Sequence, residues 1–173
     1  MVQPALMEHE VQHLNDTGRA GIIAIVGRTN VGKSTLVNHL LGEKVSIVSD
    51  TVQTTRNLIR AILTEERGQL VFLDTPGVHK AQGELGKNLN RTARSAVQGV
   101  DAILLVMDGS SRPELEDDGW LRRIAREEVP CIIAVNKADR HVDRSGEYKA
   151  LWEEIKAEKE SLKEPVWAGV SAL

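Results

Sequence analysis

The chain has 173 residues, of which 41% are hydrophobic and 27% are charged, a balance typical of one globular domain with its own core. Its 22 Lys and Arg against 25 Asp and Glu leave a formal charge of −3, which argues against a surface devoted as a whole to nucleic acid. The single cysteine, Cys131, excludes a disulfide framework and lies in an apolar run where a buried, unreactive thiol is expected. No apolar run approaches the ~18 residues that span a bilayer. The first residues lack a secretory pattern, so we expect a cytoplasmic protein.

Short apolar runs alternate with helical patterns along most of the chain. We expect a flexible leader over residues 1–20 and one folded domain over residues 21–173. The runs typical of strands buried on both faces are Ile22–Val26, Leu70–Leu73, Ala102–Met107, Cys131–Val135 and Val166–Val170. Helical patterns lie around Leu36–Leu41, Leu121–Ala125 and Tyr148–Ile155. This alternation predicts an α/β fold with a mostly parallel sheet and helices on both faces.

One segment departs from the alternation. No helical pattern separates Asn57–Thr64 from the run that begins at Leu70. We therefore expect Asn57–Thr64 to form an antiparallel hairpin with Leu70–Asp74. The sequence thus predicts a six-stranded sheet that is parallel except for one hairpin strand.

A phosphate-binding pattern, G-x-x-x-x-G-K-S/T, follows the first expected strand and precedes the first expected helix. It reads Gly27-Arg28-Thr29-Asn30-Val31-Gly32-Lys33-Ser34, with Thr35 directly after it. In such a loop the backbone N–H groups and the positive end of the helix bind phosphates. We expect Lys33 to reach the outer phosphates and the Ser34 hydroxyl to ligate Mg²⁺. The alternative is a glycine-rich turn that binds nothing, and the position between strand and helix disfavours it.

A second motif, Asp74-Thr75-Pro76-Gly77, follows the second buried run at the carboxyl edge of the sheet, where ligands bind in such folds. We expect Asp74 to hold Mg²⁺ through a water molecule. Gly77 has no side chain to clash, so its backbone N–H is expected to meet the terminal phosphate. Taken alone, the tetrapeptide is a common turn signal, and its functional interpretation depends on the phosphate loop.

A third motif, Asn136-Lys137-Ala138-Asp139, follows another buried run at the same edge. The Asp139 carboxylate is suited to accept both donors on the Watson–Crick edge of guanine, a donor pair that adenine lacks. We expect Asn136 to bond the purine and tie the phosphate loop, and the Lys137 stem to pack on the ring. A backbone N–H of Ser171-Ala172-Leu173 is a weaker candidate to meet the guanine carbonyl. The alternative for the tetrapeptide is a solvated turn.

Two further segments are candidates for function. Thr54-Thr55-Arg56 lies in a stretch without helical period, where we expect a loop whose threonine, Thr55 rather than Thr54, ligates Mg²⁺ and touches the γ-phosphate. The alternative is a threonine-rich strand start. Lys87, Arg91 and Arg94 fall on one face of an expected helix, with Lys80 nearby, and form a candidate patch for RNA or an acidic protein. A solvated basic face is the plainer interpretation.

These motifs in this order, with Ser171-Ala172 after the last strand, resemble the translation-factor-like branch of P-loop GTPases. The stretches Lys44–Ser49, Gln53–Asn57 and Phe72–Lys80 are similar to the Era family of bacterial GTPases. Related families show Gly-Thr-Thr-Arg-Asp where this chain has Gln53-Thr54-Thr55-Arg56-Asn57, which favours Era. The resemblance implies a P-loop fold and a switch that binds GTP and GDP with Mg²⁺ and hydrolyses GTP slowly. Lys33, Thr55 and Gly77 would take part in hydrolysis.

In that family a KH domain follows the GTPase domain and binds the 3′ end of small-subunit ribosomal RNA during ribosome assembly. The resemblance therefore implies the small ribosomal subunit and its rRNA as partners, with peripheral association with the inner face of the cell membrane and no DNA partner. We expect no KH domain within this sequence. We expect an incomplete GTPase domain, without its final helix and its KH domain.

The residue after Gly77 is Val78, where Ras-like GTPases have a glutamine that orients the attacking water. In GTPases with this hydrophobic replacement, an asparagine matching Asn30 helps to hold K⁺ beside the phosphates, and we expect the same here. The alternative is that Asn30 only ties the loop together. Two rival functions remain open. One is an RNA-binding module that hydrolyses GTP only with a partner. The other is an ATP-dependent kinase or ATPase, which Asp139 disfavours.

Overall fold

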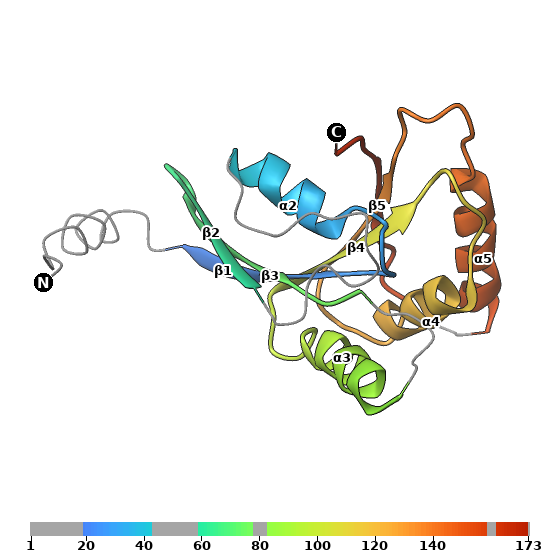
Figure 1. Ribbon diagram of the computed structural model, residues 1–173, viewed down its shortest axis with the longest axis horizontal. Coiled ribbons are helices and arrows are strands. Elements are labelled where there is room, and N and C mark those ends of the chain that lie inside the picture. The colour runs from blue at the N-terminus through green and yellow to red at the C-terminus, as the bar shows by residue number, and fades with distance from the viewer. Residues whose placement is uncertain (1–18, 43–58, 78–82, 159–161, 173) are drawn as a thin grey trace, which may run out of the picture.

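The computed structural model describes residues 19–42, 59–77, 83–158 and 162–172, which form a central sheet flanked by helices (Figure 1). The strands are β1 (Ala20–Val26), β2 (Ile59–Glu65), β3 (Gly68–Asp74), β4 (Ala102–Asp108), β5 (Cys131–Asn136) and β6 (Val166–Gly169). The helices are α2 (Lys33–Leu41), α3 (Gly83–Ser95), α4 (Leu115–Ile124) and α5 (Ser145–Ala157). The strand order is β2-β3-β1-β4-β5-β6.

The predicted sheet is confirmed, including its hairpin. β2 pairs antiparallel with β3 from Ile59 opposite Asp74 to Glu65 opposite Gly68, and all other pairs are parallel. The leader was expected to reach residue 20, but Ala20 already belongs to β1 and pairs with Gln69. Residues 1–18 lie outside the described part of the chain.

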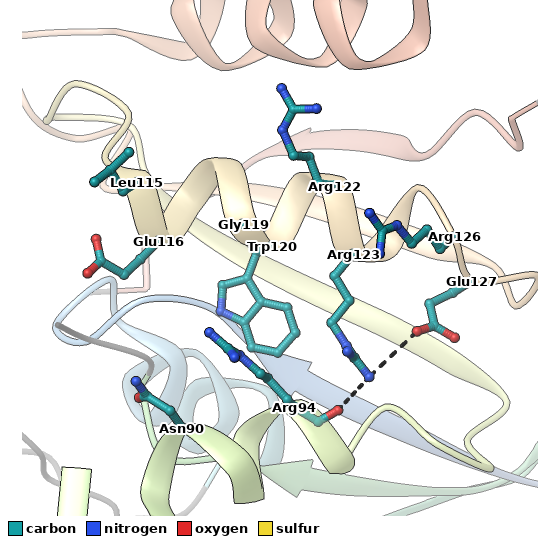
Figure 2. Close-up of a pocket in the computed structure, with 10 residues that line it drawn as sticks. All are labelled: Asn90, Arg94, Leu115, Glu116, Gly119, Trp120, Arg122, Arg123, Arg126 and Glu127. Carbon is teal, nitrogen blue, oxygen red and sulfur yellow. Dashed lines mark hydrogen bonds and ion pairs between the residues drawn. The ribbon is translucent and has the colours of Figure 1, made fainter. Parts of the chain in front are cut away.

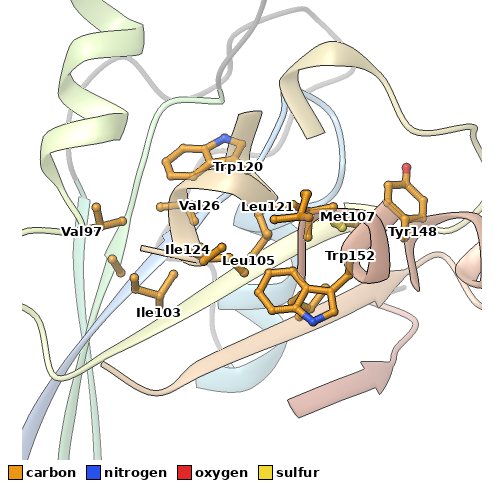
Figure 3. Close-up of a cluster of buried hydrophobic side chains, with 14 of the residues drawn as sticks. Val26, Val97, Ile103, Leu105, Met107, Trp120, Leu121, Ile124, Tyr148 and Trp152 are labelled. Atoms are coloured by element: carbon orange, nitrogen blue, oxygen red, sulfur yellow. The ribbon is translucent and has the colours of Figure 1, made fainter. Parts of the chain in front are cut away.

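Helices lie on both faces of the sheet, as predicted: α2 on one, and α3, α4 and α5 on the other (Figure 1). The larger core, on the side of α3, α4 and α5, holds Trp120 and Trp152 among the buried side chains (Figure 3). The smaller core includes Val37 of α2 and Phe72 of β3. Within β1, Ala24 and Val26 belong to the larger core, whereas Ile25 between them belongs to the smaller. Burial on both faces explains the continuous apolar runs of the sequence.

The face that carries α2 is covered less completely at its far side. Leu104, Ile132 and Val166 lie side by side on neighbouring strands β4, β5 and β6. Ile132 is 39% exposed and Val166 is 64% exposed, although both are large and apolar. Leu104 packs against the smaller core, whereas Ile132 and Val166 extend the row as exposed apolar sheet surface.

Two smaller features bear on the expectations from composition. Cys131 is half-buried rather than fully buried, and burial raises the pKa of its thiol to about 11, which disfavours a reactive thiolate. Among the described residues, none of the helices combines the length and apolar character needed to cross a membrane.

The parallel strands bring the predicted motifs together. β1, β3, β4 and β5 run in the same direction, and the register sets Ile25 beside Asp74 and Asp108 beside Asn136. The loops that follow these strands therefore leave the sheet along one edge, which is the usual ligand-binding edge of such folds.

Candidate functional site

The loop between β1 and α2 has the backbone shape that its glycines permit. Gly32 has a φ of 97°, and a Cβ there would lie 2.2 Å from Asn136 Nδ2. Only glycine combines this conformation with this close approach. Because Gly32 precedes Lys33, the first residue of α2, the loop leads directly into the positive end of a helix.

The Lys33 side chain lies inside this loop and is 6% exposed. Its Nζ donates to the carbonyl oxygens of Arg28, at 2.7 Å, and of Gly27, at 3.2 Å. Burial lowers the pKa of Lys33 to about 8, while the Asp74 carboxylate partly opposes the shift and Arg28 adds to it. The ammonium is thus held at the phosphate loop in a setting where an additional anion would stabilise its charge.

Ser34 and Asp74 meet beside Lys33. The Ser34 hydroxyl donates to Asp74 Oδ2 at 2.8 Å, and Asp74 is fully buried. A hydroxyl and a carboxylate at hydrogen-bond distance are hard oxygen donors of the kind that Mg²⁺ selects, since this ion takes one or two protein oxygens together with water and substrate phosphates. Two of the three residues predicted to hold Mg²⁺, Ser34 and Asp74, therefore lie where they fit that ion.

The loop after β3 packs against the phosphate loop. Thr75 donates its buried hydroxyl to the carbonyl of Ile25 at 2.7 Å, so this hydroxyl fixes the loop to β1. A Cβ at Gly77 would lie 2.6 Å from Thr29 Cα and 2.7 Å from Thr29 N. From the sequence, a glycine was expected at position 77 because a side chain would keep the backbone N–H away from the terminal phosphate. The structure adds a nearer reason, because the phosphate loop itself leaves no room for a side chain.

Asn136 joins three loops. It is 2% exposed, its Nδ2 donates to the Val31 carbonyl at 2.8 Å, and its Oδ1 accepts the Ala172 N–H at 3.1 Å. The tie to the phosphate loop is the one that the sequence predicted. The Ala172 N–H, one of those expected to face a ligand, is donated to Asn136 instead, and Leu173 lies outside the described residues.

The base-reading candidate Asp139 is exposed at the surface. The Ser171 hydroxyl donates to Asp139 Oδ1 at 2.7 Å and holds the pKa of that carboxyl below its usual value. A polar contact of the Ser171 side chain with Asp139 was not predicted, since only backbone groups were proposed there. The carboxylate is ionised and its orientation is set by a neighbour.

Lys137 has a φ of 66°, and its ammonium pairs with Asp108 Oδ2 at 2.6 Å. Burial alone would raise the pKa of Asp108, but hydrogen bonds from Lys137 and Ser110 lower it below its usual value. The sequence predicted that the Lys137 stem packs on a purine ring. The ion pair fixes the end of that stem.

Several predicted residues are not placed by the structure. Thr54, Thr55 and Arg56, together with Val78 and Lys80, lie outside the described residues. Asn30, the potassium candidate, is exposed and has a φ of 60°. Asparagine tolerates this left-handed conformation better than most residues.

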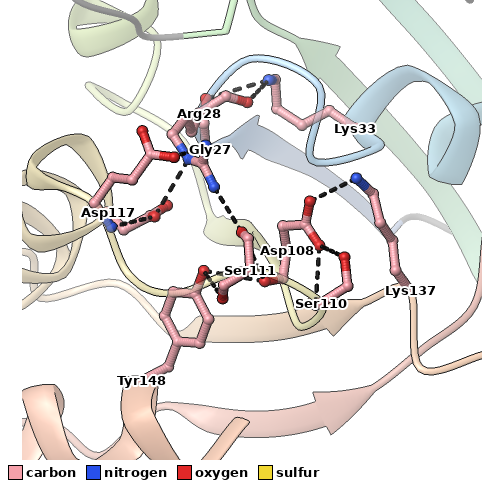
Figure 4. Close-up of polar contacts among 10 residues, drawn as sticks. Gly27, Arg28, Lys33, Asp108, Ser110, Ser111, Asp117, Lys137 and Tyr148 are labelled. Atoms are coloured by element: carbon pink, nitrogen blue, oxygen red, sulfur yellow. Dashed lines mark hydrogen bonds and ion pairs between the residues drawn. The ribbon is translucent and has the colours of Figure 1, made fainter. Parts of the chain in front are cut away.

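A polar cluster beside the phosphate loop was not predicted (Figure 4). The guanidinium of Arg28 contacts Ser111, Glu114 and Asp117, which belong to the turn after β4 and the start of α4. Glu114 and Asp117 form a capping box, in which the Glu114 N–H donates to Asp117 Oδ2 at 3.0 Å. Two carboxylates spaced three residues apart before an apolar run are a sequence signal for this cap, but not for its contact with Arg28.

Arg94, one residue of the predicted basic patch, lines a groove between α3 and α4 (Figure 2). Arg91 and Arg94 are exposed on α3, whereas the side chain of Lys87 lies outside the described residues. The groove has a volume of about 570 Å³, and three more arginines line it from the other side. They are Arg122, Arg123 and Arg126. Arg123 donates to the Arg94 carbonyl at 2.8 Å, which joins the two walls.

Comparisons with known proteins agree with this arrangement. Residues 22–137, more than half of the chain, match the family described as 50S ribosome-binding GTPase. GTPase Era of a Geobacter species is 49% identical over 121 residues, which are 70% of this chain and 41% of that protein.

Two solved structures of Era are also similar. Aquifex aeolicus Era bound to GDP·AlF4⁻ has a TM-score of 0.73 at 32% identity, over 90% of this chain and 52% of that one. Era in complex with MgGDPNP and nucleotides 1506–1542 of 16S ribosomal RNA has a TM-score of 0.74 at 33% identity, again over 90% and 52%. The chain therefore spans well under two thirds of these relatives.

Proposed function

Because the chain belongs to the family of 50S ribosome-binding GTPases and its GTPase domain is homologous to that of Era, we propose that it is a switch that binds and hydrolyses GTP. The observation that carries this proposal is the position of Asn136. Its amide bonds Val31 in the phosphate loop and Ala172 in the loop beside Asp139. One buried side chain thus holds the phosphate-binding and base-reading parts at a fixed spacing.

The residues of the site have distinct tasks in this proposal. Lys33, buried and held by Gly27 and Arg28, provides a positive charge for the outer phosphates. Ser34 and Asp74 would hold Mg²⁺, and the bound ion would neutralise charge on the phosphates. Gly77 brings its loop against Thr29 and the reacting phosphate. Thr55 lies outside the described residues, and we expect it to add a hydroxyl ligand to Mg²⁺ when GTP is bound and to lose that contact after hydrolysis.

The direct test is nucleotide selection. We expect the chain with Mg²⁺ to bind a fluorescent GDP analogue in preference to the matching ADP analogue, and to release phosphate from GTP slowly. Lys33→Ala should abolish binding, whereas Arg67→Ala, at a side chain that is 90% exposed in the β2–β3 turn, should not. Equal affinity for ADP would contradict the proposal and favour the ATP-dependent alternative.

Potassium dependence is a separate part of the proposal. Asn30 lies exposed in the phosphate loop, and a valine such as Val78 cannot orient water as a glutamine does. We expect GTP hydrolysis to be faster in KCl than in NaCl at equal ionic strength, and Asn30→Ala to lose the difference. Equal wild-type rates in the two salts would leave Asn30 as a residue that only ties the loop.

We propose the small ribosomal subunit as the partner, by analogy with the Era structure that contains 16S ribosomal RNA. The family description names the 50S subunit instead, so both subunits belong in the test. We expect co-sedimentation with small subunits to depend on GTP. Hydrolysis measured with and without subunits separates an intrinsic GTPase from a binding module that needs its partner. Preferential binding to large subunits would overturn the choice of partner without affecting GTP binding.

The basic face of α3 supports this contact with rRNA, because Arg91 and Arg94 are exposed and Arg126 lies across the groove. We expect Arg91→Glu with Arg94→Glu to weaken binding to small subunits and to flatten its salt dependence. Arg67→Glu makes one such reversal of charge, at an exposed site in the β2–β3 turn, and serves as the control for each single variant. Unchanged binding across a salt series would assign the patch to an ordinary solvated face.

The domain organisation also stays a proposal. The exposed row of Ile132 and Val166 beside Leu104 supports a further segment of the whole protein that covers this face. A chain extended beyond residue 173 should then melt at a higher temperature with the same nucleotide, and equal melting temperatures would contradict it.

Cytoplasmic location and peripheral membrane association stay predictions. Sedimentation with anionic vesicles would test the membrane association.

A further inference from the structure

Arg28 is the second residue of the phosphate loop, yet its side chain points away from the loop toward α4 (Figure 4). Its guanidinium lies 2.5 Å from Glu114 Oε1, 3.0 Å from Ser111 Oγ and 3.3 Å from Asp117 Oδ2. The side chain is 15% exposed. A guanidinium that reaches three oxygens from two elements is held in one orientation, because its donors form a rigid planar fork.

The carboxylate at the inner end of this contact is deeply buried. Asp117 is 1% exposed, and burial raises its pKa, while the Glu114 N–H and the charge of Arg28 partly offset the shift. On Arg28, burial would lower the pKa, but Asp117 and Glu114 raise it above its usual value. A buried carboxylate without a cation is costly, so the pair holds the loop and α4 together tightly.

The backbone of Arg28 points the other way. Its carbonyl oxygen accepts the Lys33 ammonium at 2.7 Å, the shorter of the two hydrogen bonds that hold this side chain. One residue therefore contacts α4 through its side chain and the phosphate-binding cation through its carbonyl. A shift of Arg28 would move the carbonyl that positions Lys33.

We propose that Arg28 is a positioning residue for nucleotide binding, and that its ion pair with Asp117 and Glu114 fixes the phosphate loop in the shape that receives phosphates. The inference rests on the proposed function. In it, the nucleotide phosphates bind favourably because α4 already holds the phosphate loop in its binding shape before the nucleotide arrives. A displacement of such a loop by about 1 Å is enough to weaken its interaction with the phosphates substantially.

A purely structural role is the competing interpretation, in which the pair only stabilises the fold. The two differ in what happens when the buried charges are replaced together by apolar side chains. Arg28→Met with Asp117→Leu removes both buried charges and leaves only Glu114, whose side chain is 54% exposed, without its cation. Such replacements often keep or increase stability, and the loss of the carboxylate that accepts the Glu114 N–H costs part of that gain. If the pair is structural only, this folded double variant should retain GDP as the wild type does. If it positions the loop, the double variant should fold and still release GDP faster.

The experiment measures dissociation of a fluorescent GDP analogue, together with urea unfolding without nucleotide. We expect the double variant to unfold near the wild-type urea concentration but to release GDP about tenfold faster. Arg28→Lys keeps the positive charge but lacks the planar guanidinium fork. Its rate of GDP release should lie between those of the wild type and the double variant. Asp117→Asn keeps the size of the side chain and should also accelerate release. Arg67→Met, which removes a largely exposed arginine, is the matched control and should not change the rate.

The outcomes separate the two proposals. Wild-type dissociation rates in the folded double variant and in Arg28→Lys would overturn the positioning role and leave the proposed function intact. Failure of the wild-type chain itself to bind GDP would overturn the proposed function first. If the double variant does not fold, the comparison of Arg28→Lys with the wild type decides the matter, because equal rates there contradict a role for the guanidinium fork.

Discussion

The two halves of the site are built differently. Around the phosphate loop, Lys33 and Asp74 are buried and bonded to groups of the fold itself. Around the base-reading loop, Asp139 and Ser171 are exposed and bonded to each other. The buried half is part of the core of the domain, whereas the exposed half consists of one oriented carboxylate at the surface.

This difference separates affinity from specificity. Changes in the phosphate half should alter folding and binding together, because buried polar groups that lose a partner are costly. Changes in the base half should alter which base is bound and leave the fold unaffected. Asn136 connects the two halves through Val31 and Ala172, so it belongs to both.

Among changes in the exposed half, Asp139→Asn should have the largest effect, and it tests whether this half determines specificity alone. The amide offers one acceptor and one donor in place of two acceptors, so it suits xanthine, whose edge carries a carbonyl where guanine has an amino group. We expect GTP affinity to fall on the order of a hundredfold and the preference to shift to XTP. Competition binding measures this. A variant that keeps the wild-type ratio of GTP to XTP affinity would show that another residue reads the base.

The next effect concerns Gly77, where the two loops of the phosphate half touch. In Gly77→Ala the new methyl group would collide with the backbone of Thr29, at 2.6–2.7 Å. We expect GTP turnover to fall by about tenfold or more, because the loop can no longer close on the phosphate loop. GDP affinity should change much less, since the closing loop serves the terminal phosphate. Single-turnover hydrolysis and GDP binding, measured side by side, distinguish this from general loss of the fold.

A third test uses pH on the buried half. With a pKa of about 8, Lys33 is charged at pH 7 in the free protein and loses its proton as the pH rises through 8. Bound phosphates stabilise the charged form, so above pH 8 binding must take up a proton, and nucleotide affinity falls by up to about tenfold per pH unit. Calorimetry in two buffers of different ionisation enthalpy measures the proton uptake. Lys33→Arg, which stays charged, should show no such dependence, and a flat wild-type profile would contradict the lowered pKa.

Most of the fold could be predicted because both cores come from the same strands. Ile25 packs on one side of the sheet and Val26 on the other, and this double burial produces the continuous apolar runs that mark parallel strands. The hairpin of β2 and β3 was predictable because no helical pattern lies between Asn57 and Leu70. The sequence placed the start of β1 too late, because the small Ala20 and Gly21 give no apolar signal at a strand start.

The site was predictable where a motif defines its own geometry and unpredictable where geometry comes from distant residues. The phosphate loop follows from spacing, since its glycines and Lys33 act locally. The contact of Arg28 with Asp117 joins residues far apart in sequence, and nothing in either segment alone points to the other. The bond from Ser171 to Asp139 also joins residues far apart in sequence. It was not predicted, because a serine after the last strand gives no signal that its hydroxyl has a partner.

The smallest effect should come from Ser171, and it tests how much the exposed half depends on orientation. Ser171→Ala removes the hydroxyl that bonds Asp139 at 2.7 Å, so the pKa of Asp139 should rise toward its usual value, and the carboxylate stays ionised at neutral pH. The base contacts survive, but the carboxylate is free to rotate, so GTP affinity should fall only about threefold with little change in the preference over XTP. Ser171→Thr retains the hydroxyl and should bind as the wild type does. A loss as large as that of Asp139→Asn would mean that Ser171 contacts the base itself.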